Sequence, residues 1–294
     1  MPPLIRLLRP HQWVKNGFVL IGLLFGHAWA IETLRLRALG AFLAFCLISS
    51  AVYVINDILD READRRHPEK RLRPLASGEV GIGSALALAA LCLSAGLALA
   101  FGALGLPASL APWLFIVYLA LNLAYSLHLK RVVILDVFII AAGFMLRLLA
   151  GTLGIGIPPS HWLLLTGLML TLFLGFAKRR AEVLVPAEPG EPHRQVLGHY
   201  SLPLLDQFIT LTAGATVITY SLYTVSEETV ALHGTRALML TVPVVLYGLL
   251  RYLYRLHRRG GGGDPARDLL SDTHLLGAGL LWLALVLGIL SRSG

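Results

Sequence analysis

The strongest chemical signal in this 294-residue sequence is a group of three aspartates at helical spacing. Asp57, Asp60 and Asp64 follow a long apolar stretch, and on a continuous helix their side chains would share one face. Carboxylates stacked in this way repel one another unless a cation lies among them. Mg²⁺ prefers oxygen ligands and often binds one or two carboxylates together with substrate phosphates. The spacing therefore predicts a Mg²⁺ site, to which Asn56 adds a neutral amide.

A basic segment follows the aspartates directly. Pro68 and Pro74 should end the helix and enclose a loop. Within this loop, Lys70 and Arg73 can contact phosphate oxygens that the metal does not take, because Arg offers a bidentate fork and Lys a point charge. The alternative is an ordinary solvated loop of mixed charge. Carboxylates at helical spacing beside a basic loop bounded by prolines favour a site for a metal–diphosphate group instead.

The composition places these motifs in a membrane protein. The chain is 56% hydrophobic and only 14% charged, with a mean hydropathy of +0.72, whereas about a quarter of a soluble domain is charged. A helix needs roughly 20 apolar residues to cross a bilayer. Nine stretches are predicted to do so: 18–30, 38–58, 82–104, 110–127, 132–151, 162–181, 204–225, 237–256 and 275–290. We therefore expect an all-α polytopic protein with one membrane domain over residues 1–294.

The distribution of basic residues predicts the orientation of this domain. Most of the 25 Lys and Arg residues fall in segments on one side of the predicted spans. By the positive-inside rule that side is cytoplasmic, and it includes the N-terminus and the aspartate motif. The same rule accounts for the net charge of +8 without a nucleic-acid partner. Cys46 and Cys92 lie within apolar stretches, which indicates packing rather than a disulfide or a thiolate metal site.

The aspartate motif resembles the first signature of the UbiA superfamily of intramembrane prenyltransferases. The resemblance is carried by residues 56–64, His67-Pro68, Lys70 and Arg73-Pro74. It implies about nine transmembrane helices around a central cavity that opens to the cytoplasmic side and to lipid. It also implies a cell (inner) membrane location, with Mg²⁺ and a diphosphate bound at the cytoplasmic end.

Further segments are similar to one branch of this superfamily, the decaprenyl-phosphate phosphoribosyltransferases. These segments are 8–16, 51–53, 124–125, 129–130, 143–147 and 178–182. Aromatic prenyltransferases of the superfamily usually carry a second Asp-rich motif where this sequence has Lys178, Arg179 and Glu182, so a second metal there is not supported. The resemblance implies Mg²⁺-dependent transfer of a 5-phosphoribosyl group from 5-phosphoribosyl 1-diphosphate to a long-chain polyprenyl phosphate, with release of diphosphate.

The resemblance and the residue types together give a set of expected site residues. Those expected to serve catalysis are Asp57, Asp60, Asp64, Lys70 and Arg73, with the three aspartates as metal ligands. Those expected to contact substrates are Gln12, Lys15, Asn16, Asn56, Tyr125, Lys130, Arg147, Lys178, Arg179, Glu182 and Tyr200. Fixed cations would suit a donor with several phosphate groups, although cations at a helix end are also common membrane anchors.

Several of these residues have open alternatives. Arg147 lies inside an apolar stretch, where an ionisable group is costly and usually functional; it either meets a phosphate or pairs with a partner on another helix. Asp136 either helps to hold the metal or ribose, or forms a cap or an ion pair with Lys130. Tyr125 and Tyr200 either contact substrate or belong to an interfacial aromatic belt.

Two other functions are compatible with the sequence. One is transfer from a polyprenyl diphosphate to an aromatic or other small acceptor, which predicts consumption of prenyl diphosphate without a ribosyl donor. The other is anion transport, but transporters place ionisable groups near the bilayer midplane, whereas most charges here gather at one face. The expected partners are polyprenyl phosphate, 5-phosphoribosyl 1-diphosphate and the bilayer, and the sequence is also compatible with a homo-oligomer.

Overall fold

The computed structural model describes residues 1–26, 28–68, 70–103, 111–185, 195–258, 262–263 and 265–292, and these residues form helices and connecting segments without a strand. The longer helices are α3 (Glu32–Leu59), α5 (Ile82–Ala98), α6 (Ala111–Leu127), α7 (Leu135–Ala150), α8 (His161–Leu184), α9 (Leu202–Val225), α11 (Val242–Arg258) and α13 (Thr273–Leu290). The shorter ones are α1 (Pro3–Leu8), α2 (Ile21–Phe25), α4 (Arg61–Arg66), α10 (Glu227–His233) and α12 (Pro265–Ser271).

Within the described part of the chain, seven helical segments are long and apolar enough to cross a membrane. These segments contain α3, α5, α7, α8, α9, α11 and α13, and α6 is a shorter apolar helix. The expectation of an all-α, multi-pass membrane protein is confirmed. The predicted spans agree with these helices to within a few residues, except that the ends placed at 104 and 110 lie outside the described residues.

The first predicted span, 18–30, differs from the structure. A 3₁₀ helix over Pro10–Leu20 precedes α2, which ends at Phe25. A close tertiary contact accompanies this difference: a Cβ atom on Gly22 would overlap the carbonyl oxygen of Gly151, just after the end of α7. The chain therefore packs backbone against backbone at Val19 and Gly22, and a side chain in place of Gly22 or Gly151 would prevent this approach.

The chain divides into two compact units. The described residues of the first unit are 1–129 and 146–158, and those of the second are 130–145, 159–185 and 195–292. Helix α7 begins in the second unit and ends in the first.

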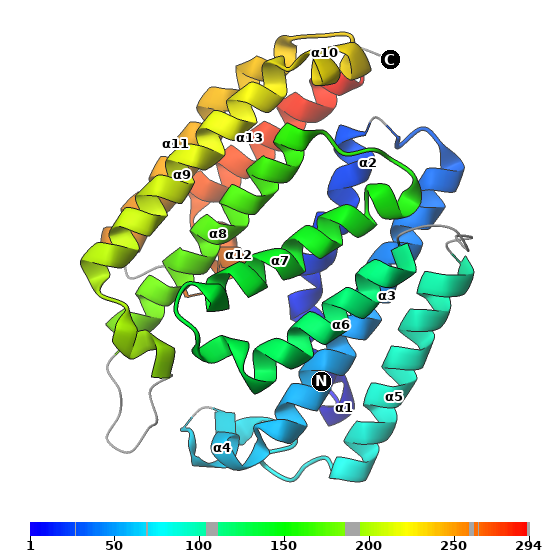
Figure 1. Cartoon of the computed structure of the whole chain (residues 1–294), viewed down its shortest axis with the longest axis vertical. Helices are drawn as coiled ribbons and strands as arrows, with labels where there is room; N and C mark the ends of the chain where they lie inside the picture. The colour runs from blue at the N-terminus through cyan, green and yellow to red at the C-terminus, as the bar shows by residue number, and fades with distance from the viewer. Residues whose placement is uncertain are drawn as a thin grey trace. The chain divides into compact units, whose positions relative to one another are not determined.

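Helix α3 is the centre of the first unit. Small residues line its buried face, among them Ala38, Ala41 and Ala44, and they let neighbouring helices approach closely. Helix α5 lies alongside α3 (Figure 1), and Gly96 packs there against Ile48. Helix α3 thus carries the aspartate motif out of a tightly packed helix pair.

Helices α8 and α9 form an antiparallel pair in the second unit (Figure 1). Buried apolar side chains join the pair to its neighbours, including Phe173, Phe176, Leu205, Ile209 and Tyr252. Thr212 and Thr216 lie on the buried face of α9, where each hydroxyl donates to a backbone carbonyl one turn earlier. The hydroxyl groups therefore enter the apolar interior without losing a hydrogen bond.

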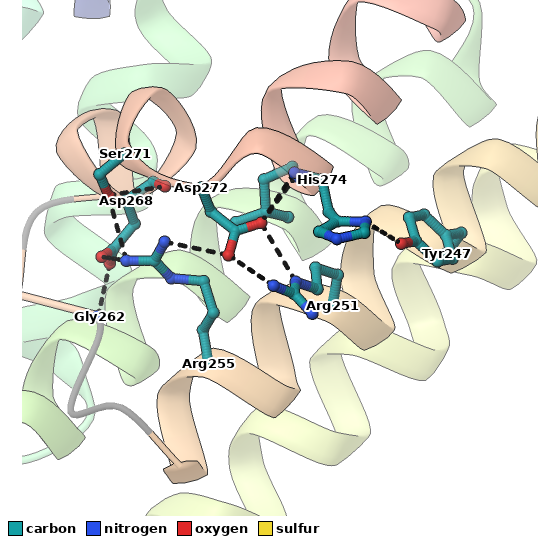
Figure 2. Close-up of polar contacts among 9 residues, drawn as sticks. Tyr247, Arg251, Arg255, Gly262, Asp268, Ser271, Asp272 and His274 are labelled. Atoms are coloured by element: carbon teal, nitrogen blue, oxygen red, sulfur yellow. Dashed lines mark hydrogen bonds and ion pairs between the residues drawn. The ribbon is translucent and has the colours of Figure 1, made fainter.

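An ion-pair network ties together the last three helices of the second unit (Figure 2). Arg251 on α11 donates to both oxygens of Asp272, at distances of 3.1 and 2.8 Å. Asp272 also caps α13, because its Oδ1 accepts the backbone N–H groups of His274 and Leu275. Arg255, one turn after Arg251, reaches Asp268 on α12 at 3.1 Å. One aspartate therefore fixes both the start of α13 and its contact with α11.

Candidate functional site

The aspartate motif lies where α3 ends. Asp57 is in the last turn of α3, Asp60 caps the helix, and Asp64 lies in the short helix α4 that follows. The side chains of Asp57 and Asp64 are buried, and that of Asp60 is half-buried. The helix is thus interrupted at Asp60, but the change of direction keeps Asp57 and Asp64 close to a common partner.

That common partner is Arg73. Its Nη1 atom lies 3.1 Å from Oδ1 of Asp57 and 2.7 Å from Oδ2 of Asp64. The predicted loop between Pro68 and Pro74 brings Arg73 back over α4, and Arg61 holds the loop there by donating to the carbonyl of Leu75. Lys70 is exposed in a 3₁₀ turn of the same loop. The structure therefore brings Arg73 to two of the three predicted carboxylates.

Arg9 is a second guanidinium at this site, and the sequence analysis gave it no role. Its Nη2 atom lies 2.5 Å from Oδ1 of Asp57, and its guanidinium lies over the ring of Tyr53, 5.3 Å from the ring centre. The backbone of Arg9 is left-handed, with φ 51° and ψ 57°, directly before Pro10. Such a conformation costs a non-glycine residue about 1–3 kcal/mol and occurs often at functional sites. The available signal was an arginine directly before a proline, within the segment 8–16 that is similar to the phosphoribosyltransferases.

A cavity of about 420 Å³ opens beside these groups. Its charged and polar lining consists of Arg6, Arg9, His11, Asp57 and Arg73. The apolar remainder comes from Met1, Pro10, Leu72 and Pro74. The cavity therefore offers several cationic groups around one carboxylate, which suits an anionic ligand.

The carboxylates fit a divalent cation that is shared with a substrate. Asp57 and Asp64 already direct one oxygen each at a single cationic nitrogen. No group of three His, Cys, Asp or Glu side chains among the described residues is arranged to hold a metal by itself. Mg²⁺ commonly takes only one or two carboxylates and completes its octahedron with waters and substrate phosphates. The arrangement thus suits a metal that arrives with a phosphorylated ligand.

Asn56 and Tyr125 lie near this motif. Oδ1 of Asn56 accepts a hydrogen bond from the hydroxyl of Ser126 on α6, at 2.8 Å. Tyr125 is half-buried on the same helix. Asn56 therefore links α3 to α6 as well as preceding the first aspartate.

Arg147 and Asn16 meet in the interior of the first unit. Nε of Arg147 donates to Oδ1 of Asn16 at 2.7 Å, and Nη2 donates to the hydroxyl of Tyr118 at 2.9 Å. The guanidinium also lies over the rings of Tyr118 and Phe45. Only 5% of Arg147 and 1% of Asn16 are exposed. Of the two alternatives for Arg147, the structure supplies partners on other helices; Gln12 and Lys15 are half-buried in the 3₁₀ helix that carries Asn16.

A second buried polar cluster surrounds Asp136 in the second unit. Asp136 is fully buried, and it accepts hydrogen bonds from Arg179, at 2.6 Å, and from the hydroxyl of Tyr200, at 2.7 Å. Arg179, which is 1% exposed, also pairs with Glu182 one turn along α8. The predicted residues Arg179, Glu182 and Tyr200 are thus brought together, and Asp136 pairs with Arg179 rather than acting only as a cap.

Tyr200 also holds a strained turn. Its hydroxyl accepts the backbone N–H of Ile134 at 2.6 Å. The φ angle of Ile134 is 68°, which is a genuine outlier for a β-branched residue. Burial, and then the hydrogen bond to Asp136, raise the pKa of Tyr200 well above its ordinary value, so the hydroxyl keeps its proton at neutral pH. Lys130 is half-buried in the turn before Ile134, and Lys178 is half-buried on α8.

Comparison with known proteins agrees with this architecture. Residues 17–271 match the UbiA prenyltransferase family. Decaprenyl-phosphate phosphoribosyltransferase of Corynebacterium glutamicum is 36% identical over 95% of this chain and 84% of its own length. The protein of the same name from Mycolicibacterium smegmatis is 35% identical over 96% of this chain and 91% of its own length.

The solved structures agree at the level of the fold. A UbiA homologue from Archaeoglobus fulgidus bound to GPP and Mg²⁺ matches 98% of this chain and 99% of its own, with a TM-score of 0.69 and 17% identity. All-helical architecture, the aspartate motif and the matches over nearly the whole chain lead to one conclusion. This chain is a multi-pass membrane transferase that belongs to the UbiA prenyltransferase family.

Proposed function

We propose that this protein transfers the 5-phosphoribosyl group of 5-phosphoribosyl 1-diphosphate to a long-chain polyprenyl phosphate and releases diphosphate. The two relatives named above, which carry this activity in their names, cover nearly the whole chain. We place the reaction at the cytoplasmic side of the cell membrane, because most Lys and Arg residues fall on the side of the aspartate motif.

One observation carries the proposal. At the end of a membrane-spanning helix, Asp57 and Asp64 converge on Arg73, beside a cavity lined by further cationic groups. Carboxylates that converge on a cation, with arginines close by, suit a diphosphate that binds through a metal. Mg²⁺ held by Asp57, Asp60 and Asp64 would neutralise the charge that develops on the leaving diphosphate.

The chain's own residues supply the remaining stabilisation. Arg73 uses one nitrogen on both carboxylates, so its other nitrogens can donate to diphosphate oxygens, and Lys70 lies in the same loop. Donors fixed before the reaction stabilise developing charge at little reorganisation cost. The bond from C1 to the diphosphate oxygen breaks with its electron pair, and an oxygen of the lipid phosphate bonds to C1. Because a phosphate monoester is largely ionised near pH 7, no general base is required.

The other predicted residues enter the proposal in two groups. Asn16, Arg147, Arg179, Glu182 and Tyr200 form buried contacts within their own units, and we assign them to holding the helices in place. The residues that stay predicted substrate contacts are Gln12, Lys15, Asn56, Tyr125, Lys130 and Lys178.

A product assay tests the proposal. Purified protein is incubated with Mg²⁺, polyprenyl phosphate and donor labelled in the ribose, and a parallel reaction contains polyprenyl diphosphate and an aromatic acid. We expect labelled lipid in the first reaction and no prenylated acid in the second. The reverse result would assign the chain to aromatic prenyl transfer, and anion uptake into liposomes without turnover in either reaction would assign it to transport.

A further inference from the structure

The cavity beside Asp57 has more cationic groups than a diphosphate site alone requires. Asp57 and Arg73 form the wall next to the carboxylates, and Arg6, Arg9 and His11 extend the lining along the N-terminal segment. A prenyl diphosphate has one anionic group, whereas 5-phosphoribosyl 1-diphosphate has a second, the phosphate monoester on C5 of the ribose. A donor with an anion at each end needs a second cationic region, and this cavity provides one.

Of the two arginines in the N-terminal part of this lining, Arg9 has more unused hydrogen-bonding capacity than Arg6. Arg6 already pairs with Glu79 at 3.0 Å and donates to the carbonyl of Leu72. Arg73 is shared between two carboxylates. Arg9 uses only Nη2, on Asp57, and its Nε and Nη1 atoms have no hydrogen-bond partner in the described ranges of the chain. Nη2 carries two N–H groups and uses one of them on Asp57, so its second N–H, together with that of Nε or Nη1, leaves one planar fork for bidentate binding of a phosphate.

The backbone conformation of Arg9 indicates that the direction of its side chain is fixed by the surrounding structure. Arg9 is held in the left-handed region between α1 and the 3₁₀ helix, immediately before Pro10. A residue before proline is normally pushed to an extended conformation. The surrounding structure must therefore stabilise this conformation, which directs the Arg9 side chain to Asp57 and the cavity.

We propose that the region of this cavity formed by Arg6, Arg9 and His11 binds the 5-phosphate of the donor, with Arg9 as its principal ligand. The assignment rests on the proposed function. The phosphate of the lipid acceptor has the same chemistry, but its isoprenoid tail requires a continuous apolar groove, whereas Arg6, Arg9 and His11 interrupt the apolar lining that Met1, Pro10, Leu72 and Pro74 provide. The donor is therefore the better source of the phosphate monoester.

Binding measurements on the purified full-length protein test the assignment without turnover. The variants are Arg9→Ala, Arg9→Lys and, as a control, Arg66→Ala, which removes an exposed arginine of α4 outside the cavity lining. The ligands are ribose 5-phosphate, pyrophosphate with Mg²⁺, and geranyl phosphate as a soluble form of the lipid acceptor. Thermal unfolding checks that each variant is folded.

We expect Arg9→Ala to weaken ribose 5-phosphate binding by about 10- to 100-fold, the effect of losing charge-assisted hydrogen bonds. Arg9→Lys should lose less, because the charge remains, and binding of Mg²⁺–pyrophosphate should change much less than that of the sugar phosphate. Arg66→Ala should bind all three ligands as the wild type does. Unchanged ribose 5-phosphate binding in folded Arg9→Ala would overturn the assignment, as would an equal loss for pyrophosphate or a loss confined to geranyl phosphate.

The outcome is separable from that of the proposed function. If the wild type turns over the ribosyl donor but Arg9→Ala binds ribose 5-phosphate normally, only the assignment of Arg9 fails. If the wild type binds ribose 5-phosphate through Arg9 but transfers no ribosyl group, the proposed reaction fails and a sugar-phosphate site remains.

Discussion

At the scale of single residues, Asp57 is a buried carboxylate that needs cationic partners. The residue is 3% exposed, and one of its carboxylate oxygens accepts from both Arg9 and Arg73. A buried carboxylate is tolerated only when cations and hydrogen bonds compensate for lost hydration. Asp57 therefore has two functions in this account: it belongs to the proposed metal site, and it holds two arginines beside the cavity.

These two functions separate Asp57 from its neighbour Asp60. We expect Asp57→Asn, Asp60→Asn and Asp64→Asn each to lower turnover by at least about 100-fold, because each removes charge from the metal site. Asp57→Asn should also cost about 1–3 kcal/mol of stability, since two charge-assisted hydrogen bonds weaken, whereas half-buried Asp60 should matter less for folding. Diphosphate release and thermal unfolding in detergent measure the two effects. Full activity in Asp57→Asn would remove it from the site.

Tyr200 is expected to stabilise the fold by holding Asp136 and the turn at Ile134 in place. Tyr200→Phe removes the hydroxyl that donates to Asp136 and accepts from the strained Ile134, so the buried carboxylate of Asp136 loses a donor and the backbone N–H of Ile134 loses its acceptor. We expect a loss of about 1–3 kcal/mol in unfolding free energy. Tyr247→Phe is the matched control, because that hydroxyl contacts His274 at an exposed position. Equal stability of the two variants would show that the Tyr200 hydroxyl does not hold the turn.

At the scale of elements, each unit contains one contact that fixes how two of its helices pack. In the first unit, glycines let α2 and the end of α7 touch through their backbones. In the second unit, Asp272 joins α11 to α13 (Figure 2). One contact depends on the absence of a side chain and the other on a charge, so they respond to different perturbations.

The backbone contact should not tolerate a methyl group. A Cβ atom on Gly151 would overlap the carbonyl oxygen of Val19, a backbone atom that cannot move aside alone. We expect Gly151→Ala to give little folded protein, as judged by gel filtration in detergent and by thermal unfolding. Gly277→Ala is the control, since nothing lies within 4 Å of its Cβ position on α13, and alanine should favour that helix by about 0.5–1 kcal/mol. Normal folding of Gly151→Ala would contradict the close approach.

The Asp272 contact should make stability depend on pH. The hydrogen bond from Arg251 lowers the pKa of Asp272 well below its ordinary value. The unfolded chain therefore takes up the proton first, so this contribution is complete above the ordinary aspartate pKa of about 3.9 and is lost as pH falls further towards the folded pKa. Unfolding temperatures measured from about pH 5 down to about pH 2 should fall less steeply in Asp272→Asn than in the wild type. If unfolding temperature fell equally steeply with pH in both proteins, the ion pair of Asp272 would not be the source of the pH dependence.

At the scale of the whole molecule, the sequence predicted the class of fold and the main motif. Long apolar stretches and the carboxylates at helical spacing are local patterns, so they can be recognised without knowing what packs against them. The interruption of the helix at Asp60 and the 3₁₀ helix before α2 were not predicted. Both features involve contacts between residues far apart in the sequence: Arg73 pairs with Asp57 and Asp64 on either side of the interruption, and Val19 of the 3₁₀ helix touches Gly151 through its backbone.

The partners of the charged residues could not be predicted in the same way. Arg9 and Asp57 are 48 positions apart, and Asp136 and Arg179 are 43 apart. A pattern along the sequence shows that a charge is present, but tertiary packing decides which opposite charge it meets. For this reason the sequence identified Arg147 as unusual but left its contacts with Asn16 and Tyr118 open, and it passed over Arg9.

The central claim is that the carboxylates and arginines at the end of α3 activate a ribosyl diphosphate for transfer to a lipid phosphate. The most direct test measures diphosphate released from 5-phosphoribosyl 1-diphosphate by the purified protein, with and without polyprenyl phosphate and Mg²⁺. The account predicts release that requires both the lipid and the metal, that accompanies a ribosylated lipid in equal amount, and that is lost in Asp60→Asn. Equal release without the lipid, or undiminished release in Asp60→Asn, would contradict it.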